Sequence, residues 1–337
     1  MTKNILASVI IPVFNSERTI KETLNSLKKQ TEKRFEVIVV DDGSTDKSYS
    51  IISNFKKSLN LKILKQKNSG PASARNKGAK ISKAEVLIFL DSDCVPKKDF
   101  IQEILKPLGD GRVSGVQGEY ETKNKKSLMA RYIGYEILFR HNSKSYSQRI
   151  DHIATYACAY RKKDFGKGFR EDFKNANMED TELSYRLAKR EKILVFNNKA
   201  IVLHPHPNSL LRFIIQQYRR GFWRILGHAN HQDKLIRDSY MGSSILVQGA
   251  LSLLFFLNLF LALIGSFFLI RVFIFPFVLL LLIIFSNATL GFYCYKYEKK
   301  MILIAPIIAT LRSLAGTLGF IVGFFYFNLK RSINKFK

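Results

Sequence analysis

The chain has 337 residues, which is long for one ordinary domain and suits two regions. Its formal net charge is +27, and such an excess indicates an anionic partner: nucleic acid, acidic lipid headgroups or a phosphorylated substrate. Long apolar segments near the C-terminus indicate a membrane, and acidic lipid headgroups are then the simplest partner for the positive charge. We therefore expect a membrane partner and no nucleic acid. Three widely spaced cysteines form neither a disulfide framework nor a zinc-ligand pattern, which favours a reducing compartment.

Strands and helices are predicted to alternate over residues 1–110. Residues 5–15 form a nearly continuous apolar run, typical of a central parallel strand buried on both faces. Because this strand begins at once, we expect no secretory signal peptide. Short loops between alternating elements predict an α/β fold with a doubly wound parallel sheet. Further strands are expected over residues 36–40, 61–64 and 86–90, and helices over residues 16–30, 47–55 and 99–108 and from about residue 72.

Two carboxylates follow the apolar strand 86–90, in the sequence I-F-L-D-S-D-C-V. Alternate residues of an extended chain share a face, so Asp91 and Asp93 can point at one ligand. Ligands of open α/β sheets bind at the carboxyl ends of strands. Two oxygen donors there suit Mg²⁺ or Mn²⁺ that carries a phosphate-bearing substrate. The alternative is an aspartate-rich turn that caps the next helix.

Four motifs in order carry a resemblance to a known family. They are S-V-I-I-P-V-F-N, V-V-D-D-G-S-T-D, G-P-A-S-A-R-N-K-G and F-L-D-S-D, all within about the first 110 residues. Together they resemble the nucleotide-binding half of family 2 glycosyltransferases, which have the GT-A fold, a Rossmann-like doubly wound sheet. The resemblance implies transfer of a sugar from a nucleotide-sugar, most often a UDP-sugar, with inversion at the anomeric carbon.

The resemblance also implies roles for residues at the ends of the first two strands. Pro12, Phe14 and Asn15 match the end of the first strand, where the nucleotide base packs. Asp42 matches the carboxylate that accepts a hydrogen bond from the uracil N–H. Asp41 matches a residue near the base and the ribose. The alternative for both aspartates is capping of the following helix.

Three further residues complete the implied donor site. Arg75 lies one turn into a helix whose N-terminus can face the diphosphate, and its alternative is a solvated surface arginine. Asp93 matches the main metal ligand of the family. Asp91 matches a position at the ribose or around the metal, and we count it as a second metal candidate. The implied cofactor is Mg²⁺ or Mn²⁺.

Residues 111–230 are predicted to form the acceptor half of a catalytic domain that covers residues 1–230. Residues 113–121 read as a strand, and residues 155–163 resemble the segment that lines the acceptor side in the family. Residues 127–141 form an amphipathic helix with basic ends. We expect this helix to pack on the sheet, and the alternative is a helix in a membrane interface.

The sequence M-E-D-T-E-L opens a helix at Glu179 and resembles the E-D motif of the family. Asp180 matches the catalytic base of that motif. An alcohol acceptor must lose its proton as it attacks the anomeric carbon, and a positioned carboxylate can remove it. The helix dipole favours the ionised carboxylate at this position. The alternative is that the acidic residues merely stabilise the first helical turn. We place Glu179 on the acceptor side.

A histidine and a basic stretch follow this helix. His204 comes after a short predicted strand and is expected near the diphosphate or the acceptor; with His206 it would make only two ligands, which is no metal site. Residues 209–229 mix apolar residues with arginines, which suits the headgroup layer of a membrane. Arg219 and Arg220 there are acceptor-side candidates. Gly221 replaces the tryptophan of the Q-x-x-R-W motif of processive synthases, which argues against a polymerase.

The C-terminal part is predicted to lie in a membrane, after a linker over residues 231–244. Residues 245–270, 272–295 and 301–327 are long apolar runs, each sufficient for a span of about 20 residues. The first two read as a tight helical hairpin, and residues 328–337 as a basic tail. With a cytosolic catalytic domain, three spans would place this tail outside, against the positive-inside rule. Either the third run does not cross or the short tail is tolerated outside, and we favour three spans.

Two features of the third apolar run stand out. Arg312 is costly inside a bilayer, so we expect it to face protein, phosphate or headgroups. Gly319 and Gly323 form a G-x-x-x-G motif that favours close helix packing and would allow a helix-mediated homo-oligomer.

These observations lead to one main hypothesis and two alternatives. The main hypothesis is a multi-pass membrane protein whose catalytic domain, on the cytosolic face, transfers a sugar to a hydroxyl of a lipid-linked or cell-surface glycan. The first alternative is a polyprenyl-phosphate glycosyltransferase, similar to dolichyl-phosphate mannose synthases. A phosphate acceptor needs no base, so the E-D pair favours a hydroxyl. The second alternative is an inactive scaffold that keeps the fold.

Overall fold

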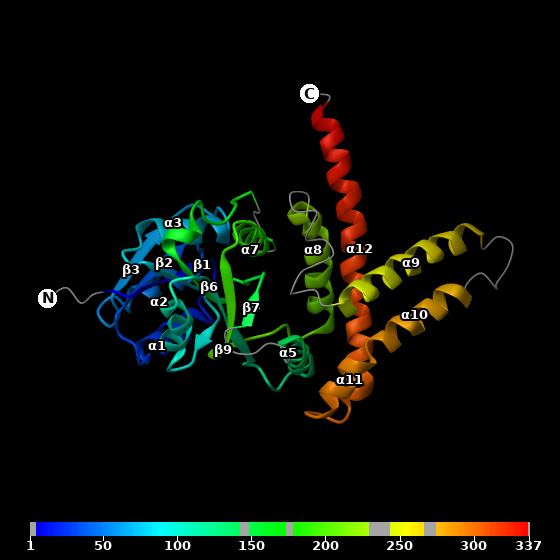
Figure 1. Ribbon diagram of the computed structural model, residues 1–337, viewed down its shortest axis with the longest axis horizontal. Coiled ribbons are helices and arrows are strands. Elements are labelled where there is room, and N and C mark those ends of the chain that lie inside the picture. The colour runs from blue at the N-terminus through cyan, green and yellow to red at the C-terminus, as the bar shows by residue number, and fades with distance from the viewer. Residues whose placement is uncertain (1–4, 142–147, 173–177, 229–242, 266–273, 336–337) are drawn as a thin grey trace. The chain divides into compact units, whose positions relative to one another are not determined.

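The computed structural model describes residues 5–141, 148–172, 178–228, 243–265 and 274–335 (Figure 1). The chain forms two compact units. The first combines Met1–Asn124 with Ser143–Pro205, and the second combines Lys125–Asn142 with His206–Lys337. The units therefore divide the chain near residue 205, before the predicted boundary at residue 230. The predicted linker, residues 231–244, lies almost wholly outside the described residues.

The first unit contains one sheet with strand order β3-β2-β1-β4-β8-β6-β9-β5, and β7 pairs with β9. Strands β1 to β4 are mutually parallel, as predicted. Beyond β4 the sheet is mixed, because β8 runs antiparallel to both β4 and β6. The strands are β1 (Ala7–Val13), β2 (Phe35–Asp41), β3 (Leu61–Lys65), β4 (Val86–Leu90), β5 (Val95–Pro96), β6 (Val113–Thr122), β7 (Gln148–Ile150), β8 (Ala157–Arg161) and β9 (Ile193–His204).

Helices cover both faces of this sheet, which explains the continuous apolar run of β1. Val9 and Ile11 belong to one buried cluster, whereas Ile10 between them belongs to the cluster on the opposite face. A strand buried on both faces needs apolar residues at every position rather than at alternate ones. The helices are α1 (Ile20–Lys28), α2 (Ser48–Ser53), α3 (Pro71–Ile81), α4 (Phe100–Leu105), α6 (Lys162–Phe165) and α7 (Glu179–Lys189), with a 3₁₀ helix over Lys106–Gly109.

The second unit is entirely helical within its described residues. Three of its helices are long and apolar enough to cross a membrane, over Leu246–Leu263, Ile274–Tyr295 and Met301–Leu329. These segments correspond to the three predicted apolar runs. The helices of the unit are α5 (Leu128–His141), α8 (Leu210–His228), α9 (Ser243–Gly265), α10 (Ile274–Ser286), α11 (Ala288–Tyr295) and α12 (Met301–Lys335).

Helix α5 packs with the apolar helices of its own unit, whereas the sequence favoured packing of residues 127–141 on the sheet. Its Met129 and Tyr132 share a buried cluster with Leu290 of α11 and Ala305 of α12. A paired hydrogen bond from Arg131 to Glu298, with N–O distances of 2.9 and 3.2 Å, adds a polar link. Other apolar helices cover the apolar face of α5. Helical periodicity predicts that such a face exists, but it does not predict which element packs against it.

Arg312 of α12 faces protein, as expected. Its guanidinium forms an ion pair with Glu136 of α5 and donates a hydrogen bond to Gln248 of α9, with an N–O distance of 2.6 Å. Ser313 donates to the same Gln248 oxygen at 3.1 Å. This polar cluster joins three helices of the second unit and compensates a charge that would be costly alone in an apolar environment.

Glycines allow α8 and α12 to pack backbone against backbone. A Cβ atom on Gly319 would overlap the carbonyl oxygen of Tyr218, and one on Gly323 would lie 2.5 Å from that of Phe222. A Cβ on Gly221 would overlap the Gly316 carbonyl. The G-x-x-x-G face is thus occupied by α8 of the same chain and not by a second copy. The close contact at Gly221 leaves no room for the tryptophan of the Q-x-x-R-W motif.

We predict that Gly319→Ala destabilises the second unit by about 1–3 kcal/mol, because the added methyl group overpacks the α8–α12 contact. The matched control is Gly249→Ala in α9, where a Cβ atom meets nothing within 4 Å. The control should be neutral or stabilising, because alanine favours helix over glycine. Thermal unfolding in detergent measures both, and equal midpoints for the two variants would contradict the packing argument.

Candidate active site

The sequence motifs meet at the carboxyl ends of the central strands. Asp93 follows β4, and His204 is the last residue of β9. The His204 Nε2 atom lies 3.6 Å from Asp93 Oδ2. Burial raises the pKa of the Asp93 carboxyl above its ordinary value, and the nearby imidazole of His204 opposes that shift. The structure thus places His204 beside the predicted metal ligand.

The Asp93–His204 pair is suited to a divalent cation. Ligand atoms of Asp93, Cys94 and His204 all lie within 4.8 Å of one another. Burial, reinforced by the neighbouring carboxylates, raises the pKa of the Cys94 thiol well above its ordinary value, so the thiol stays protonated. A carboxylate and an imidazole then remain as donors, and both suit Mn²⁺, while the carboxylate also suits Mg²⁺.

Arg75 of α3 joins two motifs that are far apart in sequence. Its guanidinium donates to Asp91 Oδ1 at 2.8 Å and to Glu179 Oε1 at 2.9 Å. Burial alone would lower the pKa of Arg75, but the two carboxylates outweigh burial and raise it. The arginine is 3% exposed, so it is no solvated surface residue. Its predicted contact with a diphosphate stays a prediction, because the guanidinium here binds carboxylates of its own chain.

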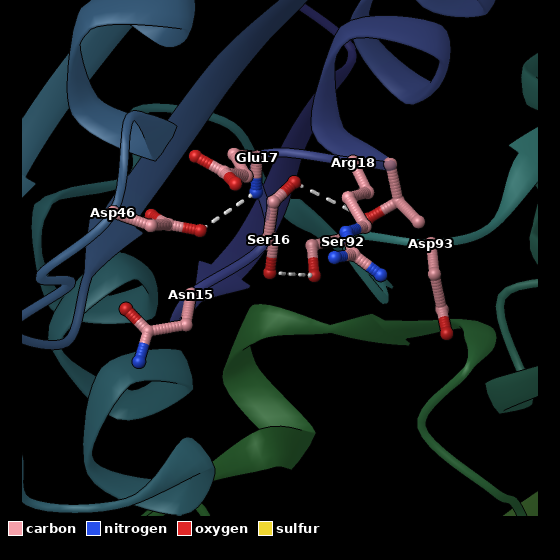
Figure 2. A pocket seen from close by; sticks show the side chains of 8 residues that line it. Asn15, Ser16, Glu17, Arg18, Asp46, Ser92 and Asp93 are labelled. Carbon is pink, nitrogen blue, oxygen red and sulfur yellow. Dashed lines mark hydrogen bonds between the residues drawn. The ribbon is translucent and has the colours of Figure 1, made fainter.

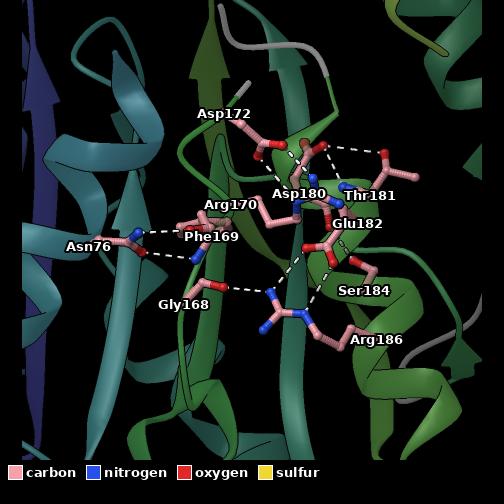
Figure 3. Close-up of polar contacts among 10 residues, drawn as sticks. All are labelled: Asn76, Gly168, Phe169, Arg170, Asp172, Asp180, Thr181, Glu182, Ser184 and Arg186. Carbon is pink, nitrogen blue, oxygen red and sulfur yellow. Dashed lines mark hydrogen bonds and ion pairs between the residues drawn. The ribbon is translucent and has the colours of Figure 1, made fainter. Parts of the chain in front are cut away.

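Asp180 lies in the first turn of α7, directly after Glu179 (Figure 3). Its Oδ1 atom accepts a hydrogen bond from the Thr181 N–H at 2.7 Å, and the Thr181 hydroxyl lies 3.0 Å from His152 Nε2. Among the described residues, Asp180 Oδ2 accepts no hydrogen bond. The catalytic-base role of Asp180 stays a prediction.

Helix α3 also anchors the segment that leads to α7. Asn76 exchanges two hydrogen bonds with the backbone of Phe169, at 2.8 and 2.9 Å (Figure 3). The Arg75 and Asn76 side chains, adjacent in the A-R-N-K-G motif, thus hold residues on both sides of residues 173–177. Arg186, further along α7, binds Glu182 and the Gly168 carbonyl. The motif positions α7 relative to the sheet.

Asp41, the last residue of β2, and Asp42, directly after it, organise the loops around the predicted base site. Asp42 is 3% exposed and accepts hydrogen bonds from the Gln66 side chain and from the Ser69 and Gly70 N–H groups. Asp41 accepts one from the Ser44 N–H at 2.9 Å. In this structure Asp42 fixes the loop that begins α3. The predicted contacts of both residues with a base and ribose stay predictions.

A cleft of about 360 Å³ opens between the end of β1 and the D-S-D motif (Figure 2). Asn15, Ser92 and Asp93 line it, together with residues 16–19 and Asp46. Asn15 has a positive φ of 48°, and its side-chain oxygen accepts a hydrogen bond from the Thr45 N–H. Phe14 is 49% exposed, an unusual position for a phenylalanine in a buried strand end and one open to a stacked ring.

The remaining candidates divide between the units. Pro12 is a half-buried residue of β1 in the first unit. Arg219 and Arg220 are exposed residues of α8 in the second unit. Their predicted acceptor role stays a prediction. Sequence reasoning missed Gln66 and His152, which lie outside the motifs, and Thr181, which lies within M-E-D-T-E-L; all three become visible through the hydrogen bonds that they make.

We predict that Arg75→Met destabilises the first unit by about 3–5 kcal/mol, because it removes the buried guanidinium that forms ion pairs with Glu179 and Asp91. Adding Glu179→Gln should recover part of the loss, since the uncompensated charge disappears. The control is Arg112→Met, whose ion pair with Asp110 is exposed and should not affect the unfolding midpoint. Chemical unfolding measures all three, and a loss no larger than that of the control would contradict the bridge.

Comparison with known proteins agrees with this geometry. A family model described as Glycosyl transferase family 2 matches residues 8–169. The poly(ribitol-phosphate) beta-N-acetylglucosaminyltransferase TarS of Staphylococcus aureus is 42% identical over 100 residues, which are 28% of this chain and 18% of TarS. Validoxylamine A glucosyltransferase of Streptomyces hygroscopicus subsp. limoneus is 30% identical over 215 residues, 54% of this chain and 48% of that protein. The chain spans less than half the length of each relative.

A solved structure extends the likeness to the whole fold. Mannosyltransferase PcManGT from Pyrobaculum calidifontis, in complex with GDP-Man and Mn²⁺, is 17% identical with a TM-score of 0.60. The likeness covers 93% of this chain and 86% of that one. At this level of identity it shows the fold alone. Residues 8–169 are therefore a glycosyl transferase family 2 domain, built on a GT-A sheet that continues to β9.

Proposed function

We propose that this chain transfers a sugar from a nucleotide-sugar to an acceptor hydroxyl, with inversion at the anomeric carbon. One observation carries the proposal: the Arg75 guanidinium binds both Asp91 and Glu179. This bridge unites the D-S-D end of β4 with the first turn of α7. The predicted base Asp180 directly follows Glu179, and the predicted metal ligand Asp93 lies two residues after Asp91, which supports the proposal that both belong to one site.

The donor half of the site supports a nucleotide-sugar. The exposed ring of Phe14 offers a stacking surface for a base, and the Asp41–Asp42 pair borders the same strand ends. The named relatives and the solved neighbour are called N-acetylglucosaminyl-, glucosyl- and mannosyltransferases, so we propose a hexose or a hexosamine as the transferred sugar. We retain a UDP-sugar as the donor.

The residues at the centre divide the chemistry between them. Asp93 and His204 would hold Mg²⁺ or Mn²⁺, with Asp91 nearby, and the bound ion supplies positive charge for a diphosphate leaving group. Asp180 accepts the proton of the acceptor hydroxyl at Oδ2, while Thr181 fixes the other oxygen. A single displacement assisted by one base inverts the anomeric carbon, and such a base contributes roughly 10²–10⁴-fold to the rate.

The acceptor is proposed to be a lipid-linked saccharide or another glycan at a membrane surface. Three helices of the second unit have the length and apolarity of membrane spans. Their outward residues include many exposed leucines and phenylalanines, which a water-soluble surface does not favour. The chain would thus be a membrane protein with its catalytic unit on the cytosolic face.

We predict that Asp180→Asn lowers kcat by about 10²–10⁴-fold with little change in KM for the donor, because the amide cannot accept the proton. The control is Asp172→Asn, which removes an exposed carboxylate paired with Arg170. Release of nucleoside diphosphate from a panel of nucleotide-sugars, with Mn²⁺ and extracted lipid-linked saccharides, measures both variants. A variant as fast as wild type would exclude Asp180 as the base and favour a polyprenyl-phosphate acceptor. A wild type that releases nothing would support the scaffold.

A second prediction concerns the metal. Chelation should abolish turnover, and added Mn²⁺ should restore it, if the Asp93–His204 pair holds a cation. We expect His204→Ala to raise the Mn²⁺ concentration for half-maximal rate by about tenfold or more, as lost metal-site interactions commonly do. Cys94→Ala should leave that concentration unchanged, because the protonated thiol is a poor ligand for this ion. Equal metal requirements in wild type and His204→Ala would contradict the assignment.

A further inference from the structure

We propose that α8 and α12 form an amphipathic layer that lies in the plane of the membrane interface, bound to anionic lipid, and that α12 does not cross the bilayer. The proposal rests on the membrane association proposed above. It concerns the third apolar helix, Met301–Leu329, whose length alone would allow a span. The α9–α10 hairpin then provides the membrane spans.

The first observation is that α8 follows the second half of α12 in the same direction. Gly319 packs against Tyr218, and Gly323 packs against Phe222. Further on, the ring of Trp223 lies 5.8 Å from that of Phe327. Successive residues of one helix meet successive residues of the other, so whatever depth this part of α12 occupies, α8 occupies a similar one.

The second observation is that the two helices have opposite outer faces. On α8, Arg212, Arg219 and Arg220 are exposed, together with Leu211 and Ile215 near its start. On α12, the face turned away from the glycine contact is apolar from Leu303 to Phe325, and its exposed fractions include 73% at Leu303 and 67% at Phe325. One basic side and one apolar side are the pattern of an element that lies in the headgroup layer above the hydrocarbon.

A crossing α12 would conflict with these faces. The contact with α8 runs through the middle and second half of α12, so a crossing would carry Arg219 and Arg220 toward the bilayer centre. Arginine is strongly disfavoured there. In the plane of the interface the same arginines meet anionic headgroups, while the apolar face of α12 meets acyl chains.

The hairpin supports the same arrangement. Helices α9 and α10 run side by side and leave the flank of α12 (Figure 1). Gln248, near the start of α9, binds Arg312 of α12. The turn between α11 and α12 is held by the Glu298–Arg131 pair. Both ends of the hairpin therefore lie near α5 and α12. Two spans that enter and leave the bilayer on the same side require this arrangement.

Charge placement agrees with two spans. The turn after α11 contains Lys296, Lys299 and Lys300, and the chain ends with four more cations, Lys330, Arg331, Lys335 and Lys337. With α12 in the interface, both groups remain on the side of the catalytic unit. The positive-inside rule is then satisfied by both groups, and Arg271, between the two spans, is the exception.

The test measures the depth of nitroxide labels in vesicles of phosphatidylcholine and phosphatidylglycerol, from the accessibility of each label to oxygen and to a water-soluble nickel complex. The three native cysteines are buried, and unmutated protein carried through labelling gives the background. On the apolar face of α12, labels are attached to the variants Leu303→Cys, Leu318→Cys and Phe325→Cys. On α9, control labels are attached to the variants Val247→Cys, Leu254→Cys and Leu261→Cys.

We expect the three α12 labels to lie at one shallow depth and the α9 labels to become steadily deeper. A crossing α12 would spread its outer labels over about 33 Å along the helix, with the Leu318→Cys label near the bilayer centre and the other two near opposite surfaces. That result would overturn the proposal, and so would a uniformly shallow α9. Release of nucleoside diphosphate by the same vesicles tests the proposed function separately, so the two can fail independently.

Discussion

The buried guanidinium of Arg75 is the interaction on which the catalytic unit depends. A charge that is 3% exposed persists only when opposite charges surround it, and here those charges come from the end of β4 and the start of α7. The cost of burying one cation is offset by fixing two carboxylates that belong to different motifs. Each bridged residue has a neighbour of proposed function, Asp93 beyond Asp91 and Asp180 beside Glu179. The same ion cluster thus contributes stability and positions the chemistry.

The second unit is also held together by specific contacts between segments that are distant in sequence. Arg312 is compensated by Glu136 and Gln248 from two further helices, while glycines allow α8 and α12 to approach closely. Neither device is general hydrophobic packing, because both specify one partner and one register. This specificity explains why α5, which is inserted between two strands of the sheet in sequence, belongs to the helical unit. The outward surface of that unit then reflects its surroundings, with basic residues on α8 and apolar residues on α12.

Local sequence patterns predicted much of the first unit, and non-local contacts limited the rest. Strands β1, β2 and β4 and the helix after Pro71 were predictable because consecutive apolar residues and a helix-starting proline are local signals. The antiparallel β8 between β4 and β6 was not, since strand order depends on pairings across the fold. The approach of His204 to Asp93 likewise depends on where β9 ends. Arg75 was predicted to be a site residue, and that role stays a prediction. Its two carboxylate partners were not predicted, because the pairing of side chains from distant segments does not appear as a periodic pattern in the sequence.

The proposed reaction is a single displacement at the anomeric carbon, assisted by Asp180, within one site that the Arg75 bridge assembles. Proton nuclear magnetic resonance of the first product formed from an α-linked nucleotide-sugar tests this most directly, because it reports the anomeric configuration before any later exchange. We expect a β-linked product, the inverted configuration. An α-linked product would require two displacements or an attack from the leaving-group side, and would contradict the role assigned to Asp180.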